Sequence, residues 1–116
     1  MKLQACYEQI GANYKDLVVR LGSEAFAQLF AKKFLEDDSF ANIKNGLDDN
    51  DAETAFRAAH TLKGVAQNLS LDNLYRPAFD LTESLRGRVI TAECAPLYAK
   101  VEEEYNKTIA ALQQLD

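Results

Sequence analysis

The chain has 116 residues, which is the size of one ordinary domain with a single hydrophobic core. Apolar residues make up 47% of it and charged residues 27%, a balance that is typical of a soluble globular protein and argues against a disordered tail. The formal net charge of −5 argues against sequence-independent binding to nucleic acid, which requires a basic surface, and it disfavours binding to a membrane surface for the same reason.

The sequence lacks the signals of a membrane-spanning or secreted protein. No apolar run approaches the roughly 18 residues that span a bilayer, and the N-terminus lacks the long apolar stretch of a secretory signal. We therefore expect a cytoplasmic protein. Cys6 and Cys94 are too few and too isolated to indicate a disulfide framework or a zinc site, so both are interpreted as small buried or half-buried apolar residues.

The N-terminal part of the chain is predicted to form a short helical segment. Helical spacing of apolar residues runs from about residue 3 to residue 21, with a break near Gly11. Gly22 is expected to end this stretch, and Ser23 is a suitable N-cap for the helix that follows.

The next stretch is predicted to be one long amphipathic helix, loosened around residues 37–39. Its apolar residues recur at intervals of three and four, at Phe26, Leu29, Phe30, Phe34, Phe40, Ile43 and Leu47. The polar run at residues 48–51 is rich in turn-forming and N-cap residues. Such a run could suggest a calcium loop, but the glycine and the ligand spacing of an EF-hand are missing, so we predict a turn.

Two further helices are predicted in the C-terminal part of the chain. One runs from about residue 73 to residue 85, with Asp72 as its cap and Gly87 at its end. Pro77 is expected to bend this helix or to delay its start. The last helix begins within residues 91–94 and continues toward the C-terminus.

Another helix is predicted at residues 52–69, between the turn at residues 48–51 and the helix that starts near residue 73. No segment of the chain has the apolar–polar alternation of a β-strand. These elements predict an all-α fold. We expect an antiparallel up-and-down four-helix bundle with a shorter N-terminal helical segment packed over one end. No repeat or linker divides the chain, so residues 1–116 are expected to form a single domain.

His60, the chain's one histidine, lies in the middle of the predicted helix 52–69. At about 100° per residue, the core-forming residues fall within about 40° of the side opposite His60; they are Ala58, Leu62, Val65 and Leu69, with Ala55 beside them. His60 is therefore predicted to face water.

The surface around His60 favours a functional role over that of a solvated surface histidine. Within two turns the same face carries Phe56, Arg57, Lys63, Gly64 and Gln67. Lys63 is a cation beside the imidazole, suited to an incoming anion. Gly64 costs about 1 kcal/mol relative to Ala in mid-helix, which suggests close approach of a partner. Phe56 is expected to be an exposed aromatic anchor for docking, with Arg57 beside it.

The segment Ala59-His60-Thr61-Leu62-Lys63-Gly64, continued through Leu69, resembles the phosphorylation segment of histidine-containing phosphotransfer (Hpt) domains. In that family a His is followed by an aliphatic residue, Lys and Gly. The preceding Phe-rich stretch, the Asp-containing turn and the helix after Asp72 also resemble the family pattern. The resemblance covers most of the chain, but only the His-to-Gly segment is specific.

The resemblance implies a phosphorelay protein without independent turnover. His60 would accept a phosphoryl group from a receiver-domain aspartate or a kinase, including a hybrid histidine kinase, and pass it to another receiver. A histidine is substantially unprotonated near neutral pH, so a ring nitrogen can attack phosphorus without a dedicated base. Lys63 would balance the added charge. The chain would need no cofactor or metal, because Mg²⁺ belongs to the receiver, and it is expected to be a monomer.

Two positions depart from the family pattern. Gln67 stands where many relatives have a small residue, and it could hydrogen-bond the imidazole or the phosphoryl group, or obstruct docking. Ser70 stands where many have a glycine, and it could end the helix or cap the next one.

Three other interpretations compete with this one. A helical adaptor that binds receivers without taking phosphate is favoured by Gln67. A four-helix carboxylate metal enzyme requires Glu-x-x-His pairs, and this chain has one His with no Glu three residues before it. The dimerisation helices of a histidine kinase would be followed by a nucleotide-binding domain, and the chain ends at Asp116 without one.

Overall fold

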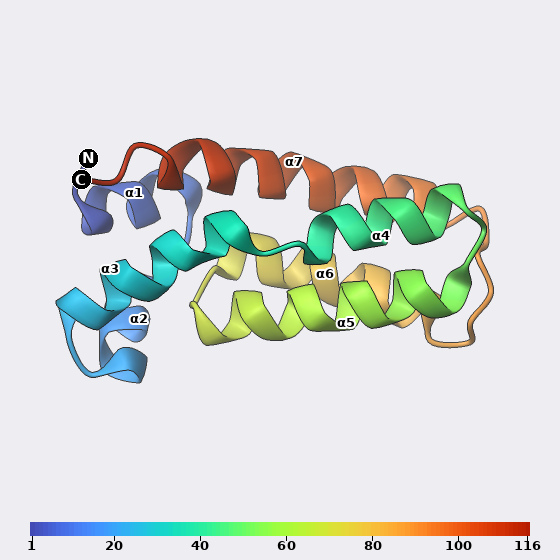
Figure 1. The fold of residues 1–116 in the computed structure, drawn as a ribbon, viewed down its shortest axis with the longest axis horizontal. Coiled ribbons are helices and arrows are strands. Elements are labelled where there is room, and N and C mark those ends of the chain that lie inside the picture. The colour runs from blue at the N-terminus through green and yellow to red at the C-terminus, as the bar shows by residue number, and fades with distance from the viewer.

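Every regular element of the protein is a helix (Figure 1). The computed structural model describes residues 1–116. The elements in chain order are α1 (Leu3–Ile10), α2 (Tyr14–Leu21), α3 (Glu24–Lys33), the 3₁₀ turn η1 (Phe34–Glu36), α4 (Ser39–Asp48), α5 (Ala52–Asn68), α6 (Asp72–Leu85) and α7 (Cys94–Leu112). The predicted all-α class is confirmed. No helix is both long enough and apolar enough to cross a membrane.

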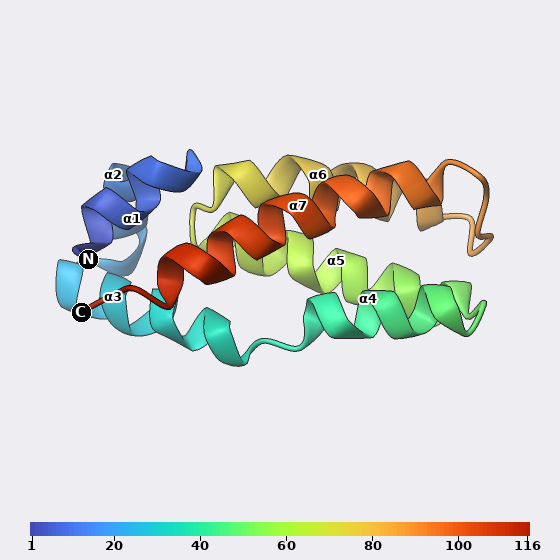
Figure 2. The same ribbon diagram turned by 90° about the horizontal axis from the view of Figure 1, so that it is seen from above.

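The helices α4, α5, α6 and α7 lie side by side along the long axis of the molecule and alternate in direction (Figures 1 and 2). Helix α5 packs on both α4 and α6, and α6 packs on α7. Aromatic rings join α4 to α7, where Phe40 stacks on Tyr105 with ring centroids 4.2 Å apart. The short helices α1 and α2 lie with α3 at one end of the molecule.

The N-terminal segment follows the prediction from its turn residues. Gly11 ends α1 and Gly22 ends α2, each in the left-handed conformation with φ of 78° and 84° that glycine adopts readily. The hydroxyl of Ser23 accepts a hydrogen bond from the backbone of Phe26 at 3.1 Å, so Ser23 is the N-cap of α3 as expected.

The single long helix predicted after Ser23 is interrupted. The chain tightens into η1 and then extends at Asp37, whose carboxylate accepts a hydrogen bond from the backbone of Ser39 at 2.9 Å at the start of α4. An Asp side chain competes with the helix for backbone groups and favours helix starts. The expected loosening around residues 37–39 is therefore a complete break between α3 and α4.

Helix α3 also buries a different face from the one predicted. The large side chains of Phe26, Leu29 and Phe30 are 56%, 48% and 42% exposed. The buried residues instead are Ala27 and Ala31, one helical turn apart. Small side chains permit close packing of the helix, and they leave the larger apolar side chains outside.

Helix α6 ends at Leu85 as predicted, but the residues that flank its two ends have other roles than those predicted. Its N-cap is Leu71, so Asp72 is the first helical residue and not the cap. Pro77 lies inside α6 and does not delay its start. The helix ends at Leu85, before Gly87, and the left-handed residue beyond it is Arg88, with φ of 58°.

Ser70 ends α5 in a left-handed conformation with φ of 53°. Its N–H bonds to the carbonyl of Gln67, and the N–H of Leu71 bonds to that of Ala66, which is the Schellman pattern of a helix C-terminus. The Ser70 hydroxyl donates to the Asp16 carboxylate at 2.6 Å. Of the two roles expected for Ser70, the structure has the helix end and not the N-cap of α6.

Candidate functional site

His60 lies in the middle of α5, and its side chain is exposed, as predicted. The residues that α5 buries are Ala55, Phe56, Ala58, Ala59, Leu62 and Ala66. Val65, predicted to be in the core, is half-buried, whereas Leu69 is buried just beyond the helix. The imidazole nitrogens of His60 make no hydrogen bond within the chain, so they are free to react or to bind a partner. The nearest aromatic ring is that of Phe56, 6.0 Å away between centroids and inclined by 13°.

Phe56 is not the exposed aromatic that we predicted. It is only 8% exposed, because residues of the α6–α7 loop cover its ring. The guanidinium of Arg88 lies 3.7 Å from the ring centroid and that of Arg86 lies 5.4 Å from it, both within the range of cation–π attraction. The helical phase of α5 predicts that Phe56 lies near His60. It does not predict that the α6–α7 loop covers the Phe56 ring.

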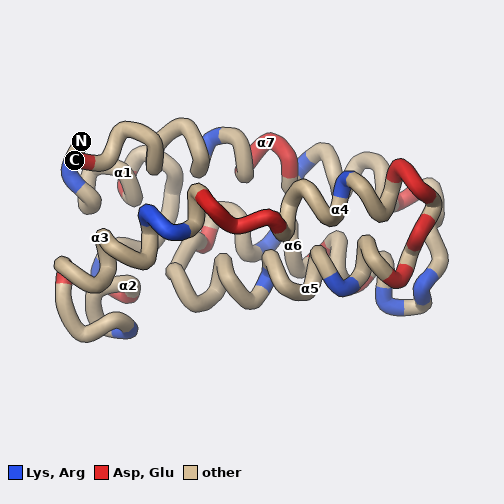
Figure 3. The backbone as a smooth tube through the Cα atoms, viewed as in Figure 1, with Lys and Arg blue, Asp and Glu red and all other residues tan.

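Arg57 is exposed, and its Nε donates to Oε1 of Glu53 at 2.7 Å. The other carboxylate oxygen of Glu53 accepts from Arg88 at 2.8 Å. Hydrogen bonds from Arg88 and then Arg57 lower the pKa of the Glu53 carboxyl. Figure 3 shows the basic residues of the α6–α7 loop near the N-terminal end of α5. The sequence prediction named Arg57 and missed Arg86 and Arg88.

The Lys63 side chain extends from α5 toward α6. Its Nζ lies 5.5 Å from the centroid of the Phe79 ring of α6, and it forms no ion pair within the chain. A hydrogen bond from Arg86 is the main cause that lowers the pKa of Glu83, and the charge of Lys63 adds to this effect. The Lys63 ammonium therefore keeps its hydrogen-bonding capacity for another anion.

Gly64 and Gln67 complete the predicted set of residues. A β-carbon built on Gly64 would meet no atom within 4 Å, so nothing in this chain requires a glycine at that position. Gln67 is exposed, and its amide makes no hydrogen bond within the chain. Both positions are open to a partner molecule.

A family model described as the Hpt domain matches residues 27–115 of this chain. The chain belongs to the Hpt domain family. Comparisons with curated proteins and with solved structures gave no match. Hpt domains are phosphocarrier modules that interact with receiver domains and kinases in phosphorelays. The predicted family is thereby confirmed, and α1 and α2 lie outside the matched residues of this Hpt domain.

The sequence analysis missed one surface of this Hpt domain. Beside the C-terminal half of α5 lies a groove lined by Phe30, Lys33, Phe34, Asp37, Val65, Asn68 and Leu69. The ring of Phe30 is exposed, and so is that of Phe26, one turn earlier on α3. The sequence of α3 has two apolar stripes, one of large side chains and one of alanines. The sequence analysis assigned the stripe of large side chains to the core, whereas the structure buries the alanines.

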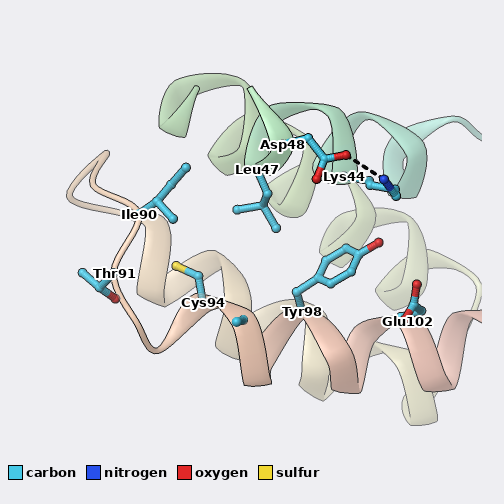
Figure 4. A pocket seen from close by; sticks show the side chains of 9 residues that line it. Lys44, Leu47, Asp48, Ile90, Thr91, Cys94, Tyr98 and Glu102 are labelled. Atoms are coloured by element: carbon cyan, nitrogen blue, oxygen red, sulfur yellow. Dashed lines mark hydrogen bonds and ion pairs between the residues drawn. The ribbon is translucent and has the colours of Figure 1, made fainter. Parts of the chain in front are cut away.

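The largest cavity of the Hpt domain lies elsewhere. Its volume is about 360 Å³ and no residue of α5 lines it. Figure 4 shows its lining residues from α4, α7 and the loop before α7, with the ion pair between Lys44 and Asp48, 2.6 Å long, at its edge. Burial is the main cause that raises the pKa of Tyr98 in this cavity to about 12. The cavity is therefore separate from the surface that surrounds His60.

Proposed function

We propose that this Hpt domain carries a phosphoryl group on His60, accepting it from a receiver-domain aspartate or a kinase and passing it to another receiver. The observation that supports this most directly is the exposed imidazole in mid-helix, whose nitrogens have no partner in the chain. A helix holds such a nucleophile more rigidly than a loop does. The open space at Gly64 leaves room for the partner's reacting group.

The proposed transfer needs no oxidant or cofactor in this chain. An unprotonated ring nitrogen of His60 forms a bond to phosphorus while the bond between phosphorus and the aspartyl oxygen of the receiver breaks. The receiver's carboxylate leaves with the electron pair, and Mg²⁺, where the receiver holds it, would balance the charge of that carboxylate. The next receiver reverses the step, because its carboxylate attacks the phosphoramidate and the imidazole leaves.

The neighbours of His60 are proposed to handle the added charge. The Lys63 ammonium forms no ion pair with a carboxylate of the chain. It would attract the phosphoryl oxygens as a point charge. The Gln67 amide, free of partners in the chain, would donate a hydrogen bond to the imidazole or the phosphoryl group. Neither residue replaces the nucleophile, so each would change the rate or the lifetime of the phosphorylated form.

We propose that a receiver docks over His60 and across the groove beside α3. Because Phe56 is covered, the apolar anchors of this interface would be Phe26, Leu29 and Phe30 and not Phe56. Interfaces commonly combine an apolar centre with a polar rim, and Arg57 would belong to that rim. The antiparallel bundle of α4 to α7, with α3 extending α4, is the proposed carrier, acting as a monomeric single domain.

The direct test is incubation of the protein with a phosphorylated receiver and Mg²⁺, followed by an assay for acid-labile, base-stable phosphate. Because the chain has one histidine, phosphohistidine formed on this protein has a single possible location. His60→Gln should abolish the signal and leave the fold intact, because the side chain is exposed and makes no hydrogen bond within the chain.

Two results would contradict the proposal. Acid-labile phosphate on His60→Gln would show that the acceptor lies elsewhere. Stable binding of receivers by the parent protein without phosphate uptake would instead support the adaptor function that Gln67 suggested, and Gln67→Ala would then show whether this side chain blocks transfer.

A further inference from the structure

The loop between α6 and α7 folds over the part of α5 that precedes His60. Arg88 has a left-handed backbone, with φ of 58°, and its N–H bonds to the carbonyl of Leu85 at 2.8 Å. This turn directs the chain back toward α5. A non-glycine residue in this conformation is uncommon and is maintained by surrounding contacts.

The side chain of Arg88 supplies those contacts. Its Nε donates to Glu53 of α5 at 2.8 Å, and its Nη1 donates to the carbonyl of Arg86 at 2.6 Å. With both groups anchored, the guanidinium lies 3.7 Å from the centroid of the Phe56 ring. Arg86 is farther away, and its guanidinium is engaged by both carboxylate oxygens of Glu83 at 3.0 Å.

Phe56 in turn borders His60. The two rings are nearly parallel, at 13°, with centroids 6.0 Å apart, a separation at which aromatic rings attract each other. No hydrogen bond within the chain holds the imidazole, and the Phe56 ring is the aromatic ring stacked beside it. Arg88 is therefore linked to the His60 imidazole indirectly, through the Phe56 ring that lies between them.

We propose that Arg88 is a positioning residue of the transfer site, which fixes the Phe56 ring and so holds the His60 imidazole in the orientation presented to the receiver. This inference rests on the proposed role of His60 as phosphoacceptor. Arg88 need not touch the phosphoryl group. Its loss would make the approach of the nucleophile less well aligned, and small misalignments reduce the rates of group transfer.

The test variant is Arg88→Asn, because Asn tolerates the left-handed conformation and the substitution removes the guanidinium while preserving the turn. Arg88→Lys keeps a cation over the Phe56 ring, so its transfer rate constant should lie between those of Arg88→Asn and the parent protein. Arg57→Gln is the control for the imidazole resonances only, since it removes the other arginine bound to Glu53 but belongs to the proposed docking rim. Arg76→Gln, which removes an exposed arginine of α6 paired with Asp80, is the control for the transfer rate. Melting curves establish that all variants are folded.

Transfer from a phosphorylated receiver is measured across receiver concentrations. We expect Arg88→Asn to lower the rate constant at saturating receiver by about five- to tenfold, with an unchanged half-saturating concentration. A rise in the half-saturating concentration alone would overturn the proposal, because Arg88 would then be a docking contact. A parental rate constant for Arg88→Asn would also overturn it.

Nuclear magnetic resonance of the single imidazole separates this inference from the proposed function. The ring current of Phe56 affects the His60 ring protons, so their chemical shifts should move in Arg88→Asn, move less in Arg88→Lys and stay unchanged in Arg57→Gln. Unchanged shifts in Arg88→Asn would refute the positioning role. If the parent protein took up no phosphate, the proposed function would fail, and the shifts alone would decide whether Arg88 orients the imidazole.

Discussion

The backbone of Ala55 in α5 lies directly against Gly46 in α4. A β-carbon built on Gly46 would be 2.6 Å from the Ala55 nitrogen and 2.9 Å from its Cα, closer than such atoms can approach. The neighbour is backbone, so it cannot rotate away as a flexible side chain would. This contact sets the separation of α4 from the helix that carries His60.

Gly46→Ala should therefore destabilise the protein by about 1–3 kcal/mol, the usual cost of overpacking, which corresponds to roughly 4–8 °C in Tm for each kcal/mol. Thermal and denaturant unfolding measure this change. Gly64→Ala is the control, because its new methyl group enters open space and alanine favours the helix by up to about 1 kcal/mol. Equal stability of Gly46→Ala and the parent would show that α4 and α5 separate without cost.

Gly64→Leu should block transfer from a receiver while the protein stays folded. The leucine side chain would project from the surface one turn after His60, where a partner has to approach. Stability should not fall, because Leu is a better helix former than Gly by up to about 1 kcal/mol. Transfer rates of Gly64→Leu and Gly64→Ala, with melting curves, test this. Parental transfer by Gly64→Leu would place the docking face elsewhere.

The position of His60 was predictable, whereas the surroundings of the site were only partly so. The phase of Ala58 and Leu62 is a local property of one helix, and both are buried as expected. The burial of Phe56 depends on a loop more than 25 residues away in sequence, near Arg88, whose left-handed turn no local pattern indicated. In α3, an alanine stripe and a phenylalanine stripe competed for the core, and only the tertiary packing decides between them.

Phe30→Ser should weaken transfer from a receiver by raising the half-saturating receiver concentration. The ring is exposed and lines the groove beside α5, so its loss removes a docking contact and no core packing. Phosphorylation by a small-molecule phosphodonor, which needs no docking surface, should stay unchanged. Val19→Ser is the control, since Val19 is exposed but lies on α2 outside the groove. An unchanged half-saturating concentration for Phe30→Ser would argue against docking at α3.

Lys63→Ala should slow transfer or shorten the lifetime of the phosphorylated form without preventing phosphorylation. The substitution removes a charge near the nucleophile, and no ion pair in the chain is lost with it. The effect should be larger at low salt, because screening weakens exposed charge interactions. Lys100→Ala makes the same change in net charge on α7. If Lys63→Ala matches Lys100→Ala in rate and lifetime at low salt, Lys63 has no part in transfer.

Ser70→Gly should alter how stability depends on pH in the acid range. Hydrogen bonds from Ser70, and secondly from Arg20, lower the pKa of Asp16. A carboxyl whose pKa is lower in the folded state stabilises the fold at pH values above its unfolded-state pKa. This stabilisation is lost as the pH falls through its folded-state pKa. Ser70→Gly removes the main cause, so its Tm should fall less steeply than the parent's on acidification.

Arg20→Gln serves as the comparison for this experiment, because it removes only the second cause and should produce a smaller change in the acid slope. The other carboxylates with lowered pKa, including those of Asp51 and Glu53, are common to all three proteins and cancel in the comparison. Identical acid slopes for the parent and Ser70→Gly would show that the Ser70 hydroxyl does not stabilise the ionised Asp16.

The open space at Gly64 has a consequence for how this protein can evolve. A substitution there by a helix-forming residue is not penalised by selection that acts through folding, because its β-carbon enters open space and the helix gains stability. Only a partner can penalise it, so the position is free to drift in a copy of the protein that has lost its receivers. Gly46 has no such freedom, since every folded copy must keep α4 close to α5. A library of variants at both glycines could be screened first for stable expression and then for phosphate uptake. Variants at Gly46 should be depleted in the first round, and variants at Gly64 only in the second.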